Sequence, residues 1–418
     1  MREMQQILNG KIIGLPSYQF WAAFIIIIIG SISGFLSLNN QGSTSIFWLV
    51  GIVFGITVQR SRFCFTSAFR DFFLLGQARV IKGILAGLAV STIGFTMVMS
   101  MSSPNPSFGA PPMDANVLPL GLSTLIAGIL FGIGMVLAGG CVSGSLYRMG
   151  EGYLASWVAI LGVMIGLFLL NNTWNWWWEN LISQEISIWL PAELKYSGAL
   201  IFTAIGLLGI LYISVWRERK VTAGFVMPKI KKLNSPSMPT NSFSEIVSYG
   251  KRLFDDEWNP ITGGIILGIL NILLFIRFHP LGVVGEISRW STSLVGYMGI
   301  PPVHLEGMEG LGACAPVITE GGSWFTEGFF LNIGIVVGAF VAAVLAREFK
   351  LRIPRSPVRY IQSIIGGTIM GYGAGLGLGC TLGAFFSAVP SLALNGWVYA
   401  LGLAIGSYIS VQWIKRFP

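Results

Sequence analysis

The strongest constraint on this chain is a series of apolar runs, each close to the length of a helix that crosses a lipid bilayer. A spanning helix needs roughly 20 mostly apolar residues, and the candidate runs are 18–38, 46–59, 82–101, 118–138, 153–171, 195–216, 260–277, 329–346, 361–379 and 395–413. Only 11% of the residues are charged, against roughly 25% in soluble domains. The sequence therefore predicts an all-α integral membrane protein with about ten transmembrane helices. We expect the first run to be retained, because no cleavage site of small residues follows it.

Lysine and arginine are concentrated in alternate loops between these runs. Basic clusters follow the runs that end near residues 59, 216, 346 and 413, whereas the Pro-rich loop 102–116 contains none. Under the positive-inside rule, the basic loops and both termini face the cytoplasm. The net charge of +8 is therefore a topology signal and does not indicate nucleic-acid binding. We interpret the polar segment 221–257 as a cytoplasmic linker between a first membrane half, 1–220, and a second half, 258–418.

A repeated motif relates the two halves. The segment GIGMVLAGGCVSGS around Cys141 matches GYGAGLGLGCTLGA around Cys380, and in one register they share four glycines, a leucine and the cysteine. A second match aligns WVAILGVMIG, from Trp157, with WVYALGLAIG, from Trp397. The loop charges orient the helix before Cys141 toward the cytoplasm and the helix before Cys380 away from it. We therefore predict two inverted repeats, an architecture that places a substrate site near the membrane midplane.

Three of the four cysteines lie where an apolar run breaks and a short, more polar helix is expected to follow. Such re-entrant helices end inside the protein, where irregular backbone lines a cavity. Their N-termini offer free N–H groups and a partial positive charge, which suit an anion. Glycines beside the cysteines let a ligand approach the backbone. The predicted substrate pathway consists of Cys64, Cys141, Cys380, Arg62, Gly140, Ser143, Gly379 and Thr381.

Plainer interpretations stay open for several of these residues. Buried cysteines also act as small hydrophobic side chains in packed bundles, and we assign that structural role to Cys314, which has no repeat partner. Ionisable groups in membrane segments are candidate functional groups, and they are equally explained as ion pairs between neighbours such as Arg148 and Glu151. The residues proposed for a vestibule are Arg148, Glu151, Glu286 and Arg289.

With these motifs the chain resembles the YeeE/YedE family of bacterial inner-membrane proteins, also called the sulfur-transport family, and it is similar to the YedE branch. The matching motifs are RSRFCFTSAFRD around Cys64, LAGGCVSGSLYRMGEG at 137–152, GVVGEISRW at 282–290, FKLRIPRS at 349–356 and GLGCTLGAFFSAVPSLALNGW at 377–397. The resemblance implies an hourglass-like fold in the bacterial cell inner membrane. It also implies uptake of thiosulfate or a related sulfur species, with Cys64, Cys141 and Cys380 along the path. Members similar to YedE are associated with selenium metabolism, and a cytoplasmic sulfurtransferase would be a partner.

Two mechanisms are open for such a pathway. Thiols can donate weak S–H hydrogen bonds to an anion at successive sites, or a membrane sulfur-transfer protein can pass sulfur through cysteine persulfides. The second mechanism needs a base, and the two histidines, His279 and His304, are far from Cys141 in sequence. The cysteines are isolated, which does not indicate a soft-metal path, and no GxxxxGK[ST] motif occurs. We predict a transporter without a cofactor, with a selenium compound as the alternative cargo.

Overall fold

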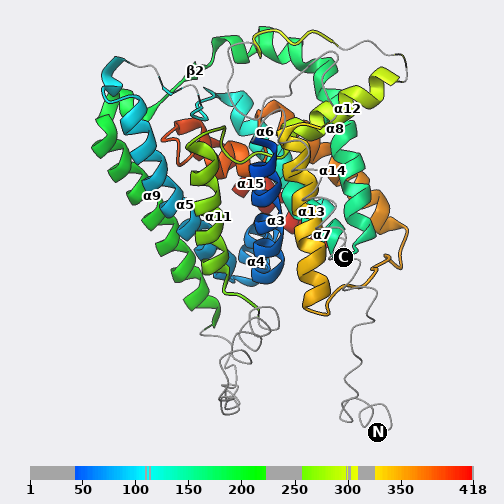
Figure 1. Ribbon diagram of the computed structural model, residues 1–418. Coiled ribbons are helices and arrows are strands. Elements are labelled where there is room, and N and C mark those ends of the chain that lie inside the picture. Colours follow the sequence, from blue (N-terminus) through cyan, green and yellow to red (C-terminus); the bar gives the residue numbers. More distant parts are fainter. Residues whose placement is uncertain are drawn as a thin grey trace.

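The computed structural model describes residues 43–108, 111–112, 114–222, 257–297, 299, 303–308 and 325–416, and most of these residues are helical (Figure 1). The strands of this part of the chain are two residues long and antiparallel, β1 (Pro119–Leu120) and β2 (Ile186–Ser187), and the remaining residues form turns and loops. The predicted first span at 18–38, nearly all of the predicted linker 221–257 and Cys314 lie outside the described residues.

The long helices coincide with the predicted spans that fall in this part of the chain. They are α3 (Ser43–Ser61), α5 (Arg79–Ser102), α6 (Leu122–Ala138), α8 (Leu154–Asn180), α9 (Leu190–Thr222), α11 (Pro260–Phe275), α13 (Glu327–Leu345), α14 (Val358–Leu376) and α15 (Leu394–Arg416). Among the described residues, seven stretches are long and apolar enough to cross a membrane, and α14 with the bent helix after it makes an eighth. Helix α11 is apolar and 16 residues long. The prediction of an all-α membrane protein is confirmed.

One helix end was predicted wrongly. The sequence predicted a span that ends at residue 171, but α8 continues through a Trp-rich segment to Asn180. The added turns contain neither glycine nor proline, so nothing in them interrupts the helix. Trp174 is fully buried, and its Nε1 donates to the carbonyl oxygen of Glu306 at 2.9 Å. Tertiary contacts therefore hold the Trp-rich segment in helical form.

Glycines allow the long helices to pack closely in pairs. Helix α3 packs against α13, α5 against α11, α6 against α15, and α8 against α14. In each pair a glycine of one helix faces a glycine of the other; the facing pairs are Gly51 with Gly334, Gly83 with Gly264, Gly128 with Gly402, and Gly162 with Gly367. Small residues of this kind let backbones approach one another where lipid removes the hydrophobic driving force between helices.

Replacing a glycine in one of these contacts should destabilise the fold. In Gly264→Ala the new Cβ would run into the carbonyl group of Gly83, with 2.7 Å to its carbon atom. We expect the variant to lose roughly 1–3 kcal/mol of stability, the usual range for overpacking, seen as a lower melting temperature in detergent. Gly209→Ala on α9 is the matched control, because no atom lies within 4 Å of its added Cβ. An unchanged melting temperature in Gly264→Ala would contradict this account of the packing.

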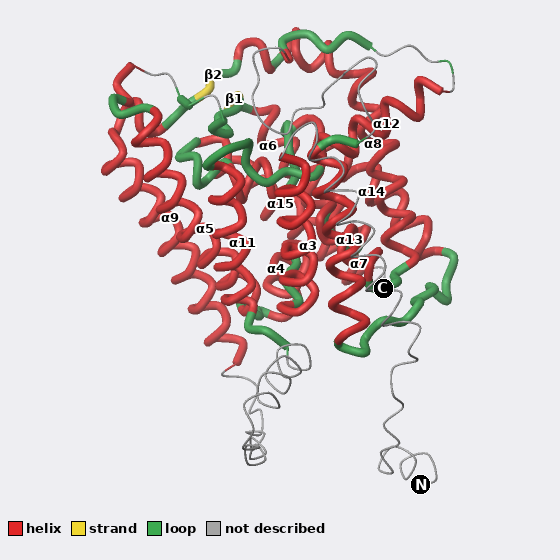
Figure 2. The backbone as a smooth tube through the Cα atoms, in the orientation of Figure 1, coloured by secondary structure: helices red, strands yellow, loops and turns green. Residues whose placement is uncertain are grey.

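Short helices fill the interior between the long ones. Helix α4 (Phe65–Leu75) follows α3, α7 (Val142–Gly150) follows α6, and η4 (Thr381–Ser387) follows α14. Helix α4 contacts α5 and α15, α7 contacts α8 and α13, and η4 contacts α15. A fourth short helix, α12 (Val284–Tyr297), packs against α8. The tube view shows the loops and turns that separate these segments (Figure 2).

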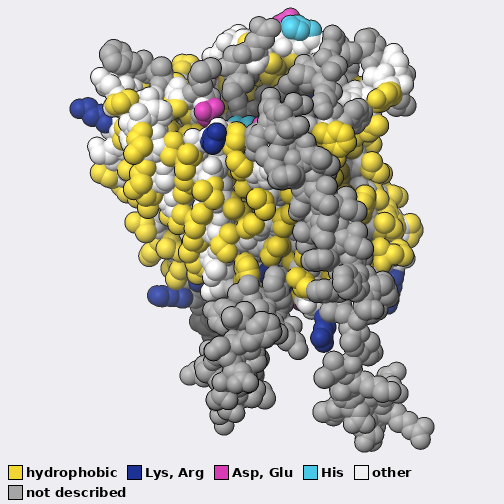
Figure 3. Space-filling view, in the orientation of Figure 1, with side chains coloured by type: hydrophobic (Ala, Val, Ile, Leu, Met, Phe, Trp, Pro, Cys, Tyr) yellow, Lys and Arg dark blue, Asp and Glu magenta, His cyan; other side chains and the backbone are white. Residues whose placement is uncertain are grey.

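The two ends of the bundle differ in charge. Helices α3 and α9 finish at the lower end in Figure 1, with Arg60, Arg219 and Lys220 in their last turns. We call this the basic end. Hydrophobic side chains form a broad band above it, and on this face Lys and Arg side chains are visible below the band and also at its upper edge (Figure 3). This distribution matches a protein that crosses a bilayer.

Candidate functional site

Three cysteines stand at breaks between helices, as predicted. Cys64, Cys141 and Cys380 are the N-cap residues of α4, α7 and η4, and all three are buried free thiols. All three breaks share a backbone conformation: Arg62, with φ of 52°, follows α3, Gly139, with φ of 79°, ends α6, and Leu378, with φ of 50°, follows α14. A left-handed residue stops a helix and turns the chain. A residue of this kind therefore stands two positions before each of Cys64, Cys141 and Cys380.

Cys64 and Cys141 form a pair of thiols that face each other. Their sulfur atoms lie close together, although they belong to different helix breaks. Gly144, on the first turn of α7, lies beside both sulfur atoms. A Cβ built on Gly144 would lie 3.0 Å from Sγ of Cys141 and 3.2 Å from Sγ of Cys64. Because Gly144 has no side chain, the backbone of α7 approaches both sulfurs closely on that side.

Backbone donors and hydroxyl groups surround this thiol pair. The N–H of Gly144 donates to Sγ of Cys141 at 3.3 Å, and Oγ of Ser143 lies 3.5 Å from the same sulfur. The hydroxyl of Thr66, two residues after Cys64, and that of Thr381, directly after Cys380, are buried, and they make no hydrogen bond within the described part of the chain. Since a buried hydroxyl without a partner is costly, each can donate to a ligand that reaches it. Thr66 was missed in the sequence, where its place after Cys64 was the only signal.

Cys380 forms a second thiol position, linked to the first by a tyrosine. Its Sγ accepts from the N–H of Leu382 at 3.4 Å, and the N–H of Val283 is also directed at it. Tyr399 on α15 is fully buried and close enough to both Cys380 and Cys141 to interact with them electrostatically. Its hydroxyl donates to the carbonyl oxygen of Gly379 at 3.3 Å. Sequence reasoning did not single out Tyr399 or Val283.

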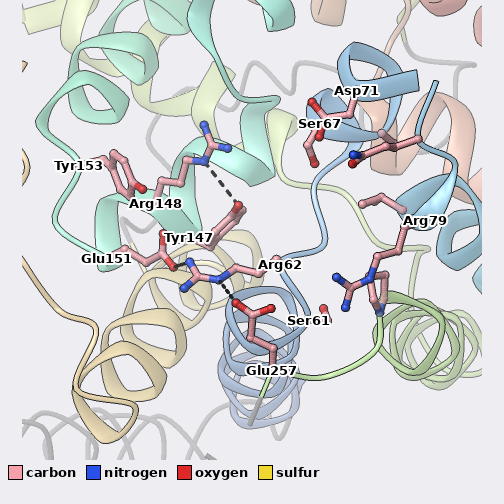
Figure 4. A pocket seen from close by; sticks show the side chains of 14 residues that line it. Ser61, Arg62, Ser67, Asp71, Arg79, Tyr147, Arg148, Glu151, Tyr153 and Glu257 are labelled. Atoms are coloured by element: carbon pink, nitrogen blue, oxygen red, sulfur yellow. Dashed lines mark hydrogen bonds and ion pairs between the residues drawn. The ribbon is translucent and has the colours of Figure 1, made fainter. Parts of the chain in front are cut away.

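A cavity of about 280 Å³ opens at the basic end, next to the thiol pair (Figure 4). Helices α4 and α7 both contribute to its wall, which includes Ser67 and Tyr147. Its charged lining residues are Arg62, Asp71, Arg79, Arg148, Glu151 and Glu257. Arg148 and Glu151, which were predicted for a vestibule, and Arg62, which was predicted for the pathway, therefore line one cavity.

The ion pairs in this cavity differ from those expected. We considered Arg148 and Glu151 as partners, but Glu151 pairs with Arg62 at 3.0 Å. Arg62 also reaches Glu348 at 2.8 Å. Arg148 instead donates to the carbonyl oxygen of Gly139 and to the hydroxyl of Tyr147, the latter at 3.4 Å. Arg148 and Glu151 are close in sequence, which suggested an ion pair, but Glu151 is paired instead with Arg62, which directly follows α3.

The environment of Glu151 makes a pH-dependent prediction. Burial raises the pKa of its carboxyl above the ordinary value of 4.5, and Arg62 and Arg148 offset part of that effect. The folded state therefore binds this proton more tightly than the unfolded chain does, so the contribution of Glu151 to stability falls as pH rises through its raised pKa. We expect the melting temperature of the wild type, relative to Glu151→Gln, to fall between pH 4.5 and neutral pH. Melting temperatures that change with pH by the same amount in the two proteins would contradict this prediction.

The other two predicted vestibule residues lie elsewhere. Glu286 and Arg289 form an ion pair at 2.6 Å on α12, at the end opposite the basic end, and Thr326 hydrogen-bonds to both. They do not line the cavity of 280 Å³. Neither histidine lines it either: His279 lies against Phe47, and His304 contributes its carbonyl oxygen to Asn175.

Comparison with known proteins gives a consistent result along nearly the whole chain. The family description "Sulphur transport" matches residues 60–409. The thiosulfate transporter TsuA of Spirochaeta thermophila is 33% identical over 371 residues, which is 88% of this chain and 97% of that protein. TsuA of Escherichia coli is 24% identical over 376 residues, 88% of this chain and 93% of the relative. The probable transporter YedE of Escherichia coli is 36% identical over 174 residues, 38% of this chain and 40% of the relative.

Proposed function

The chain belongs to the sulphur transport family, and on that premise we propose that it takes up thiosulfate, or a related small inorganic sulfur anion, through a pathway lined by cysteines. It is a multi-pass membrane protein, and two relatives that match 88% of its length are named thiosulfate transporters. An unpaired dianion cannot enter hydrocarbon unaided. The protein must therefore supply polar positions inside the bundle.

The observation that carries the proposal is the buried thiol pair at the start of two helices. Cys64 caps α4, of 11 residues, and Cys141 caps α7, of 9 residues, so two helix N-termini converge where both sulfurs lie beside Gly144. Free N–H groups and helix dipoles favour an anion at such a point. The S–H groups add weak donors. Weak positions of this kind allow an ion both to enter and to leave.

Cys380 provides the second position of the proposed pathway. Tyr399 lies near both Cys380 and Cys141, so the phenol borders the route between the two positions. Ser143 and Thr381 supply hydroxyls, and Gly140 and Gly379, directly before the two cysteines, let the chain pack closely against the turn that follows. Arg62, Arg148 and Glu151 line the vestibule at the basic end. The ion pair of Glu286 with Arg289 would belong to a vestibule at the opposite end.

Two inverted repeats explain how these positions arise. In this scheme α3, α5, α6 and α8 of the first half correspond, in that order, to α11, α13, α14 and α15 of the second half. The counterpart of the pair α3–α13 is then the pair α11–α5, and the counterpart of the pair α8–α14 is the pair α15–α6. All four pairs are packing contacts in the bundle. The left-handed residues Gly139 and Leu378 also occupy equivalent places. In this scheme Val283, before α12, is the counterpart of Cys64, before α4.

The orientation in the membrane follows from the charge distribution. We propose that the basic end, with Arg60, Arg219 and Lys220, faces the cytoplasm of a bacterial cell whose inner membrane holds the protein. Both termini would then be cytoplasmic. The vestibule of 280 Å³ opens at this end, so the anion would leave there, where a cytoplasmic sulfurtransferase could receive it.

Two other functions would give different results in transport experiments. The first is a selenium compound as the cargo. The second is transfer of sulfur through cysteine persulfides, which needs a base beside the nucleophile. His279 and His304 both lie away from the thiol pair, which favours transport of the intact anion.

Uptake in cells tests the proposed cargo. Bacteria that lack their own thiosulfate uptake would express this protein and receive radiolabelled thiosulfate, with unlabelled selenite as competitor. We expect saturable accumulation of label that selenite does not reduce. If selenite reduces the accumulation of label even when its concentration is below that of thiosulfate, the selenium alternative replaces the proposal.

A further inference from the structure

Tyr147 occupies the boundary between the thiol pair and the cavity. Its atom Cε1 lies 4.0 Å from the point that a Gly144 Cβ would occupy, and both sulfurs of the pair are within 3.2 Å of the same point. The side chain is buried, and it also belongs to the wall of the cavity. One face of the ring thus borders the sulfurs, while the hydroxyl reaches toward the cavity, as Figure 4 shows.

A single residue holds this ring in place from the cavity side. Nε of Arg148 donates to the Tyr147 hydroxyl at 3.4 Å, and the guanidinium lies 5.9 Å from the centre of the Tyr147 ring and 5.9 Å from that of Tyr153. Arg148 forms no ion pair with a carboxylate in the described part of the chain. Arg359 is near enough to repel it. The hydrogen bonds of this cation therefore go to neutral acceptors, the carbonyl oxygen of Gly139 and, at 3.4 Å, the hydroxyl of Tyr147.

We propose that Tyr147 is the gate between the thiol pair and the cavity, and that Arg148 is its latch. The inference rests on the proposed function, because it names the residues that control exit from the same pathway. Without cargo, the Arg148 bond holds the ring across the passage. A dianion at the thiol pair or in the cavity offers the guanidinium a charge-assisted, bidentate partner, which is stronger than a bond to a neutral hydroxyl. Arg148 then releases the phenol, and rotation of the ring opens the passage.

Access to the two thiols tests the gate without reference to the cargo. Purified protein in lipid nanodiscs would be treated with N-ethylmaleimide, and the labelling rates of Cys64 and Cys141 measured by peptide mass spectrometry. Tyr147→Ala removes the ring, and Tyr147→Phe keeps the ring but loses the latch. A closed state that opens only as a minor population, on the order of 1–10%, predicts that Tyr147→Ala raises the labelling rate about tenfold or more. Tyr147→Phe should give an intermediate rate.

The control is Tyr212→Ala, a loss of an exposed tyrosine on α9, which should label as slowly as the wild type. Labelling of Tyr147→Ala at the wild-type rate, in protein with the wild-type melting temperature, would overturn the gate. Labelling of Tyr147→Phe at the wild-type rate would overturn the latch. Because no cargo is present, a positive result stands even if thiosulfate proves not to be transported. Conversely, if the protein takes up thiosulfate normally and Tyr147→Ala is labelled at the wild-type rate, the gate is overturned and the proposed function is not.

Discussion

Gly144→Ala should stop transport while leaving the protein at least as stable as the wild type. The added methyl group would sit 3.0 Å from Sγ of Cys141 and 3.2 Å from Sγ of Cys64, where the proposed pathway brings the anion to both sulfurs. Alanine is favoured over glycine inside a helix by about 1 kcal/mol, which offsets the small shift the sulfurs must make. We expect thiosulfate uptake to fall by about tenfold or more, equivalent to about 1.4 kcal/mol on the barrier. Uptake into proteoliposomes and the melting temperature would be measured on the same preparation.

Two comparisons make this result specific. Gly209→Ala adds the same methyl group to α9, where no atom lies within 4 Å, and it should transport normally. Gly264→Ala disturbs helix packing, and it should lower the melting temperature. Normal uptake by a stable Gly144→Ala protein would mean that the anion does not pass between the two thiols.

Cys141→Ala should abolish uptake in a protein that still folds. This thiol lies beside the sulfur of Cys64, is 3.5 Å from Oγ of Ser143 and is close to Tyr399, so it borders both proposed thiol positions. Alanine removes the donor and leaves a small buried gap, which costs less stability than a large truncation. We expect uptake to fall to background, a loss of about tenfold or more. The melting temperature confirms folding in the same samples.

Cys314→Ala is the matched control for loss of a cysteine. Cys314 lies in LGACAP, outside the repeated motifs, and we predict that its loss leaves uptake intact. Cys141→Ser separates the roles of donor and sulfur, because a hydroxyl also donates a hydrogen bond. Uptake by Cys141→Ala at the wild-type rate would refute the role of the thiol.

The sequence predicted the helices and the breaks because both are local features. Apolar runs fixed the long helices to within a few residues, apart from the Trp-rich end of α8. Glycines and polar residues around the cysteines correctly placed the three short helices. These are properties of neighbouring residues, which hydropathy and backbone propensity describe well.

The arrangement of the site depends on contacts between distant segments, and these were not predictable from one sequence. Nothing local indicates that Cys64 and Cys141 meet, or that Gly144 lies beside both sulfurs. The pairing of Arg62 with Glu151 also required the packing of α3 near α7. The sequence also gives no signal for the role of Tyr147, because its place in the cavity wall depends on the packing of other segments around α7.

The most direct test of the central claim uses thiosulfate labelled separately at each of its two sulfur atoms. Proteoliposomes containing the wild-type protein would be given either form, and the label inside would be followed with time. Transport of the intact anion predicts that both labels enter at the same rate and that Cys141→Ala abolishes both. Entry of the outer sulfur alone would indicate transfer through a cysteine persulfide and would contradict the account, as would the absence of any uptake by folded protein.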